Sequence, residues 1–105
     1  MMDLLQLHCK ALGLPIPEKE FRFHATRRWR FDWAFIANML AVEQDGGVWV
    51  QGRHSRGAGQ IKDMEKLNEA SILGWRILRF TPKQVEKGEA ALMIKRFFDE
   101  SSCRM

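Results

Sequence analysis

Every second residue is aromatic in one short stretch of this chain, and that periodicity constrains the fold more than any other feature. The aromatic positions are Trp29, Phe31, Trp33 and Phe35. Successive side chains of a β-strand point to opposite faces of a sheet, so the stretch predicts a strand with one apolar face. A second run, over residues 40–45, begins with three apolar residues. The short gap between the two runs predicts an antiparallel hairpin.

A turn centred on Ala37-Asn38 sets the pairing of the two strands. On one face the pairs are apolar, Trp33 with Val42 and Phe35 with Leu40. On the other face they are Arg30 with Asp45, Asp32 with Glu43 and Ala34 with Ala41. A slip by one residue would send Asp32 and Glu43 to opposite faces, so the pattern favours this register. Ala-Asn is a poor two-residue hairpin loop, and a longer loop is the alternative.

The register places two carboxylates, those of Asp32 and Glu43, directly opposite each other. Opposed residues of an antiparallel pair have Cβ atoms about 4.5–5.5 Å apart. Two carboxylates at that distance repel each other unless a cation lies between them. A divalent metal with oxygen ligands is the simplest such cation. The alternative is a pair of surface acids balanced by neighbouring arginines.

The composition is that of one folded domain. The chain has 105 residues, of which 46% are hydrophobic and 29% charged. It contains no apolar stretch near the roughly 20 residues that a membrane span needs, and no signal-peptide pattern at the N-terminus. Its two cysteines, Cys9 and Cys103, form no CxxC motif, so the sequence supports neither a zinc ribbon nor a redox motif. We therefore expect a cytoplasmic protein with free thiols.

Basic residues cluster in two places, which predicts an anionic partner. The net charge is +4, and residues 22–30 carry four arginines and a histidine without an acid. A second basic segment, the glycine-rich residues 52–59, follows the hairpin. We expect phosphate contacts from both segments, although residues 22–30 could also be a solvated basic edge. The expected nucleic-acid contacts are Arg27, Arg28, Arg53, His54 and Arg56.

The remaining pattern alternates helices and strands. Helices are expected over residues 3–13, 60–73 and 89–98, and a strand over 75–80, while 18–24 could be either a short helix or a strand. In the helix over 60–73, Ile61, Met64, Leu67 and Ile72 are expected to face the sheet, with Lys62 and Lys66 on the solvated side. This order predicts an α/β or α+β domain with a mixed sheet.

Three segments together carry a family resemblance. They are Phe31-Asp32-Trp33, the run from Leu40 to Gly46 that contains Glu43-Gln44-Asp45, and Gly74-Trp75-Arg76-Ile77-Leu78-Arg79-Phe80. They resemble small stand-alone nucleases of the PD-(D/E)XK superfamily, in the branch related to very-short-patch repair endonucleases and small phage or prophage nucleases. The resemblance covers about residues 18–90. It implies one nuclease domain over 1–105 with a restriction-endonuclease-like αβββαβ core at about 18–98, an N-terminal helix and connector over 1–17 and a frayed tail over 99–105.

The resemblance also implies a catalytic site. Asp32 and Glu43 match the family's acidic residues and would hold Mg²⁺ or Mn²⁺, with the backbone carbonyl of Gln44 as a third ligand. Glu20 stands where many relatives carry a further acid. Asp45 occupies the family's lysine position, so either another cation has taken over or the site is weakened. The candidate replacements are Lys62 and Lys66.

The expected function is metal-dependent hydrolysis of phosphodiester bonds in duplex or branched DNA, in a bacterial or phage-infected cell. No organic cofactor and no membrane contact are expected. A homodimer is expected because one small nuclease has one site and cutting both strands needs two. The rival interpretation is a nucleic-acid-binding module with a degenerate site, and a third is a structural protein that docks an acidic partner.

Overall fold

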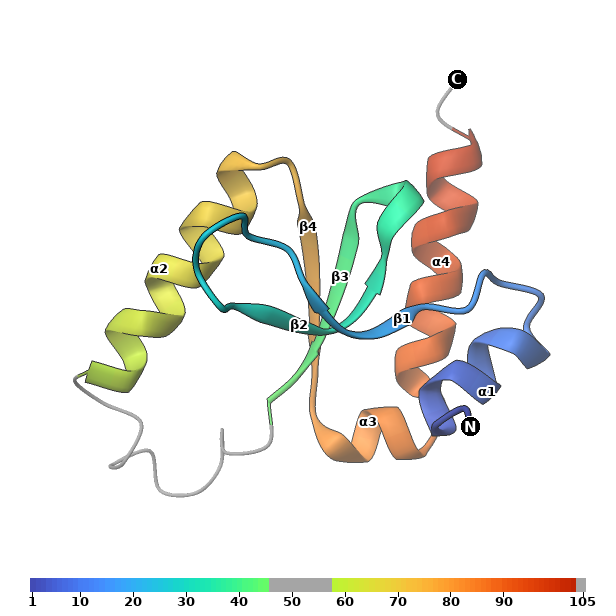
Figure 1. Ribbon diagram of the computed structural model, residues 1–105. Helices are drawn as coiled ribbons and strands as arrows, with labels where there is room; N and C mark the ends of the chain where they lie inside the picture. Colours follow the sequence, from blue (N-terminus) through green and yellow to red (C-terminus); the bar gives the residue numbers. More distant parts are fainter. Residues whose placement is uncertain (46–57, 104–105) are drawn as a thin grey trace.

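The computed structural model describes the backbone of residues 1–45 and 58–103 and shows an α/β fold (Figure 1). Within this part of the chain, a mixed sheet contains four strands in the order β1-β2-β3-β4. The strands are β1 (Glu18–Arg22), β2 (Arg30–Phe35), β3 (Leu40–Gln44) and β4 (Arg76–Phe80). β2 pairs antiparallel with β1 on one side and with β3 on the other, and β4 pairs parallel with β3.

Helices cover both faces of the sheet (Figure 1). Their bounds are α1 (Leu4–Ala11), α2 (Ala58–Ile72), α3 (Pro82–Glu86) and α4 (Glu89–Cys103), with a short 3-10 helix η1 (Ile36–Asn38). Helix α2 connects the parallel strands β3 and β4 and packs on one face, while α1, α3 and α4 pack on the other. No helix in the described ranges is long and apolar enough to cross a membrane.

The predicted register of the hairpin is confirmed for the three pairs nearest the loop, but the ladder ends there, and the predicted pairs Asp32 with Glu43 and Arg30 with Asp45 are not part of it. Trp33 pairs with Val42, and Phe35 pairs with Leu40. The loop is the longer of the two alternatives, because η1 and Met39 connect the strands. Met39 has a φ of 53°, in the left-handed region, and its carbonyl accepts a 3.0 Å hydrogen bond from the N–H of Arg76. The loop is therefore attached to the start of β4.

The expected alternation of side chains through β2 is wrong at Phe31. Phe31 packs in the cluster beneath α2, together with Ala34, whereas Trp33 lies in the cluster on the opposite face. The neighbouring strand explains the change, since Glu20 lies between the paired residues of β1 and has a φ of 51°. That left-handed residue kinks β1, and both paired strands exchange faces there.

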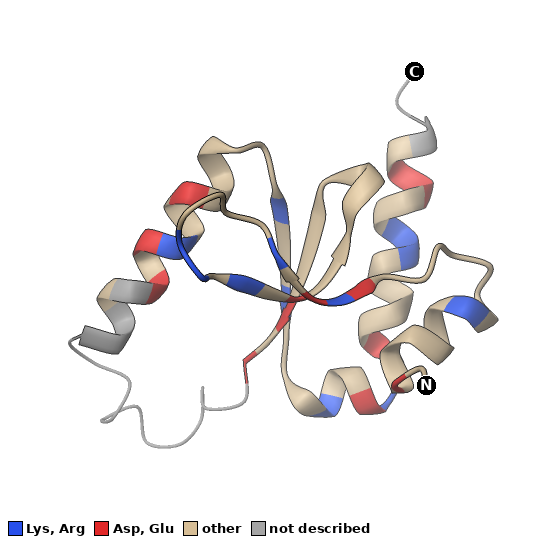
Figure 2. Cartoon of the chain, in the orientation of Figure 1, with Lys and Arg blue, Asp and Glu red and all other residues tan. Residues whose placement is uncertain are grey.

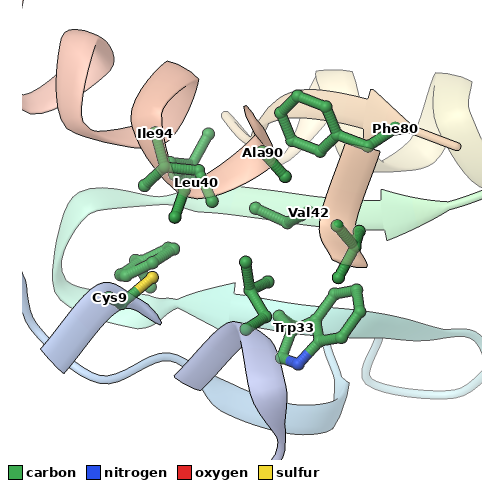
Figure 3. Close-up of a cluster of buried hydrophobic side chains, with 11 residues drawn as sticks. Cys9, Trp33, Leu40, Val42, Phe80, Ala90 and Ile94 are labelled. Carbon is green, nitrogen blue, oxygen red and sulfur yellow. The ribbon is translucent and has the colours of Figure 1, made fainter. Parts of the chain in front are cut away.

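Two capping boxes fix the helices against the larger cluster, which Figure 3 shows around Cys9, Trp33, Leu40 and Ile94. Asp3 caps α1 and also accepts a 2.9 Å hydrogen bond from the Trp33 indole.

Burial raises the pKa of the Cys9 thiol to about 11, and the charge of Asp3 adds to that effect. A thiol so buried is a packing group rather than a nucleophile.

These elements bear on two further expectations and reveal one helix that was not expected. Residues 18–22 form a strand, so the helical alternative for 18–24 is wrong. The tail expected to fray over 99–105 is helical as far as Cys103. Helix α3 was not predicted, although Thr81-Pro82 with Gln84 is a capping-box signature that could have revealed it. The glycine-rich segment 52–57 and the possible strand over 48–50 lie outside the described residues.

Helix α2 is rotated away from its predicted orientation. Ala70 is fully buried against the sheet, and Lys66 points inward with it. Three of the four residues expected to face the sheet are instead exposed, with exposed fractions of 55% for Ile61, 52% for Met64 and 76% for Ile72, while Leu67 is half-buried. A small residue and a lysine, rather than the apolar stripe, therefore make the contact with the sheet.

This orientation predicts how two substitutions in α2 differ. Ile72→Gln should change the free energy of unfolding by less than about 0.5 kcal/mol, because the side chain is exposed. Ala70→Leu should lower it by about 1–3 kcal/mol, because no room exists for three more carbons. Urea unfolding at one fixed protein concentration measures both. A larger loss for Ile72→Gln than for Ala70→Leu would contradict the observed orientation.

Candidate active site

A buried ion pair joins β3 to α2. Glu43 has an exposed fraction of 7% and is the one buried charged residue in the described part of the chain. Lys66 places its Nζ 2.8 Å from Oε2 and 3.0 Å from Oε1 of Glu43, so one ammonium group donates to both oxygens. The same Nζ lies 5.7 Å from the centre of the Phe31 ring. The pair is thus enclosed by an aromatic face as well as by the sheet.

The pKa of the Glu43 carboxyl is raised above its ordinary value of 4.5. Burial is the largest cause, because it disfavours the charged form, and the negative charge of Asp32 adds to it. The hydrogen bond and the charge of Lys66 act in the opposite direction and offset part of the rise. The pKa of this carboxyl therefore reflects two opposing effects, desolvation that raises it and one cation that lowers it.

Asp32 lies beside Glu43 at the point where β2 and β3 separate. Its Oδ2 accepts a 2.8 Å hydrogen bond from the backbone N–H of Gln44. The last residue pair of the ladder before this point is Trp33 with Val42. This hydrogen bond links β2 to β3 beyond the end of their ladder, and it holds the Asp32 carboxylate beside Gln44, the residue after Glu43.

Asp45 is bound to a different arginine from the one predicted. Arg79 of β4 donates from Nε to Oδ2 of Asp45 at 2.6 Å. Its Nη2 atom lies 3.5 Å from Oδ2 of Asp63 on α2. Arg30, the predicted partner, instead lies 3.6 Å from Glu20. The reason is the kink in β1 and β2, which separates Arg30 from the end of β3. The hydrogen bond that Arg79 donates to Asp45 raises the pKa of the Arg79 guanidinium.

The possible metal ligands are two carboxylates and one carbonyl. Asp32, Glu43 and the backbone carbonyl of Gln44 are oxygen donors, which hard divalent cations prefer. Glu20 lines an open hollow of about 430 Å³ together with Asp32 and Gln44, while its carboxylate pairs with Arg30. In the described part of the chain, no group of three or more His, Cys, Asp or Glu side chains is suited to hold a metal. Water and substrate oxygens would have to complete the coordination.

The basic loop between β1 and β2 lies against α2. Figure 2 shows basic positions along this loop, next to acidic positions on the helix. His24 contacts Glu69 at 3.1 Å, and Arg27 lies 3.6 Å from Glu65 while its guanidinium stacks 4.0 Å from the centre of the Trp29 ring. Arg28 is exposed. The loop is therefore attached to the same helix that supplies Lys66.

Four predicted site residues cannot be compared with the structure. Arg53, His54 and Arg56 lie in the segment 46–57, outside the described residues, and the side chain of Lys62 is outside them as well. Of the two lysines considered, Lys66 is the one seen beside Glu43. The spacing of Asp63, Lys66 and Ala70 puts these residues on one helical face, and that spacing is the signal that could have selected Lys66.

Comparisons with known proteins give two relatives and no activity. The uncharacterized protein MT2308 of Mycobacterium tuberculosis strain CDC 1551 / Oshkosh and the uncharacterized protein Rv2248 of strain ATCC 25618 / H37Rv are each 30% identical to the chain over 93 residues. The matched region is 85% of this chain and 33% of each relative, so the chain spans about a third of their length. No family model matches the chain, and no solved structure matches it.

The ion pair predicts a pH-dependent loss of stability on substitution. Lys66→Met removes the cation that lowers the pKa of Glu43, so that pKa rises further in the folded state. A folded state with the higher pKa holds its proton more tightly, and the free energy of unfolding then falls as pH rises from about 4.5 through the folded pKa. We expect a loss of about 3 kcal/mol at neutral pH, where the carboxylate is buried without its partner.

The control is the double variant Glu43→Gln/Lys66→Met, in which neither charge remains. Urea unfolding between pH 4 and 8 should show the single variant approaching the double variant at the acidic end and falling below it at neutral pH. Equal stability of the two variants at neutral pH would show that Lys66 does not compensate the charge of Glu43.

Proposed function

We propose that this protein is a metal-dependent nuclease that hydrolyses phosphodiester bonds in DNA. The observation that carries the proposal is the buried Glu43 carboxylate, held by Lys66 and lying beside Asp32. A buried charged group is costly to a small domain. Carboxylates with perturbed pKa values, placed next to each other, are typical of catalytic and metal-binding sites.

The order of the elements supports the same proposal. A helix, three antiparallel strands, a crossover helix and a strand parallel to the third occur in sequence. This is the αβββαβ order that the resemblance to PD-(D/E)XK nucleases implies. In this arrangement Asp32 comes from the second strand and Glu43 from the third, which are the positions expected for the two acids.

The donor set fits a magnesium or manganese ion. Mg²⁺ is commonly held by one or two carboxylates, with water and substrate phosphate filling the other positions. Asp32 and Glu43 would hold the ion with the carbonyl of Gln44. When bound, such an ion lowers the pKa of a coordinated water and neutralises the scissile phosphate.

Lys66 would serve in place of the lysine that the resemblance expects at position 45. It lowers the pKa of Glu43 and orients that carboxyl through two hydrogen bonds, and its ammonium group has three donors. A donor released from Glu43 could stabilise the negative charge that develops on the phosphate. The basic loop with Arg27 and Arg28 lies on the same side of the sheet and would contact the DNA backbone.

The rival function is DNA binding without cleavage. One observation favours it, because Asp45 stands at the position of the expected lysine and is bound to Arg79. A binding module needs the basic surface but does not need Asp32, Glu43 and Lys66 to lie together. The two functions therefore differ in whether these three residues affect a chemical step.

Cleavage assays with plasmid, branched and single-stranded DNA test the proposal. The wild type should cut at least one of these substrates with Mg²⁺ or Mn²⁺ and none with EDTA. Asp32→Asn and Glu43→Gln should lose cleavage and also lose the heat of Mn²⁺ binding in titration calorimetry, because each removes a carboxylate ligand. DNA binding without cleavage under every metal would establish the rival function.

A second experiment tests Lys66 as the replacement cation. Lys66→Met should lower the single-turnover rate about a hundredfold or more and leave DNA binding nearly unchanged, because a group that acts in the transition state affects turnover. Lys95→Met is the matched control, since Lys95 also pairs with a carboxylate, Asp99, at 2.8 Å on the exposed side of α4. Equal rates for Lys66→Met and Lys95→Met, with both variants folded, would reject this role.

A further inference from the structure

The two outer strands of the sheet differ in how they are protected from pairing. β1 is lined by exposed charged residues, and the left-handed Glu20 interrupts its ladder. Charges and kinks at a sheet edge prevent the addition of another strand. β4 carries two exposed charges, Arg76 and Arg79, but no left-handed residue interrupts its ladder, and its central residues Ile77 and Leu78 are apolar and only partly exposed. Within the described residues no strand pairs with its outer side.

The unpaired main-chain groups of β4 can be assigned. The N–H of Arg76 donates to Met39, and the carbonyl of Phe80 accepts from Asp45, so residues 76 and 80 point their polar groups toward β3. Main-chain groups alternate in direction along a strand. Ile77 and Arg79 therefore direct their N–H and C=O groups outward, where another strand can bind them.

Apolar side chains flank this edge on both faces of the sheet. On the α4 side, Leu78, Met93 and Phe97 line a groove whose other lining residues are charged or polar, namely Arg76, Arg96, Glu100 and Ser101. On the α2 side, Glu65 and Glu69 contact the loop between β1 and β2, and the helical repeat places Met64 and Leu67 on the opposite flank, toward β4. The exposed fractions of Met64 and Met93 are 52% and 44%. The outward main-chain groups of β4 thus lie between exposed apolar side chains of α2 on one face and a groove of mixed character on the other.

We propose that two copies of this chain pair antiparallel through β4 and form one continuous sheet. A two-fold axis at Leu78 would place Ile77 opposite Arg79 of the second copy, so that both outward-facing residues exchange hydrogen bonds. This register also sets Arg76 opposite Phe80 and avoids facing arginines. A shift that centred the axis on Arg79 would oppose two like charges, which is unfavourable.

A second copy is the occupant that this edge fits best. The pairing is self-complementary, because the same five residues of β4 form the contact in both copies. The two-fold axis also brings α2 of one copy toward α2 of the other, and α4 toward α4. Because the axis is perpendicular to the sheet, both copies would present the Glu43–Lys66 pair on the same face. The dimer does not rest on the proposed function, although two sites on one face would suit cleavage of both DNA strands.

The test combines mass measurement with two matched double variants. Sedimentation analysis of the wild type at micromolar concentrations should give twice the 12.3 kDa of the chain. Met64→Glu/Met93→Glu should give monomers, because the two-fold axis brings equal charges together. Ile61→Glu/Leu92→Glu adds the same charge at exposed fractions of 55% and 58% on the outward sides of the helices, and it should stay dimeric.

Amide exchange locates the interface directly. In the wild type the amide protons of Ile77 and Arg79 should be protected, and in the monomeric variant they should exchange faster while Leu78 stays protected by β3. Circular dichroism confirms that both variants are folded. A monomeric wild type, a dimer that survives Met64→Glu/Met93→Glu, or unprotected Ile77 and Arg79 amides in the dimer would each overturn the proposal.

Discussion

The buried contact between Glu43 of β3 and Lys66 of α2 determines how helix α2 packs on the sheet. A carboxylate with an exposed fraction of 7% needs a cation or a proton, and α2 supplies the cation from its sheet-facing side. Placing Lys66 over β3 requires a small residue one turn later, and fully buried Ala70 meets that requirement against the cluster that contains Phe31 and Trp75. The rotation of α2 thus follows from one ion pair.

Desolvation of this pair is expensive, and hydrophobic residues of similar volume would often be at least as stable. The raised pKa of Glu43 shows that Lys66 compensates the burial only in part. Asp32, whose charge adds to the rise, is nevertheless fixed nearby by the N–H of Gln44. The metal site that we propose would account for an arrangement that concentrates negative charge at a cost in stability.

The hairpin register was predictable because it depends on local alternation and on adjacent pairs such as Trp33 with Val42. Two features were not, and both depend on contacts between distant parts of the chain. Phe31 lies on the unexpected face because a left-handed residue in β1 kinks both strands, and periodicity within β2 carries no trace of it. Helix α2 turns its apolar stripe outward because Glu43, twenty-three residues away from Lys66 in sequence, attracts that lysine inward.

The same rotation connects the site to the surface. Once Lys66 and Ala70 face the sheet, the helical repeat forces Ile61 and Ile72 outward and turns Met64 and Leu67 toward the open edge of β4. A domain that buried its apolar stripe would have no such border beside β4 and would leave Glu43 without a cation. Exposed apolar area on α2 is therefore a direct consequence of the charged pair, and it lies where a second copy can cover part of it. One polar contact in the interior thus shapes both the candidate site and the face available for association.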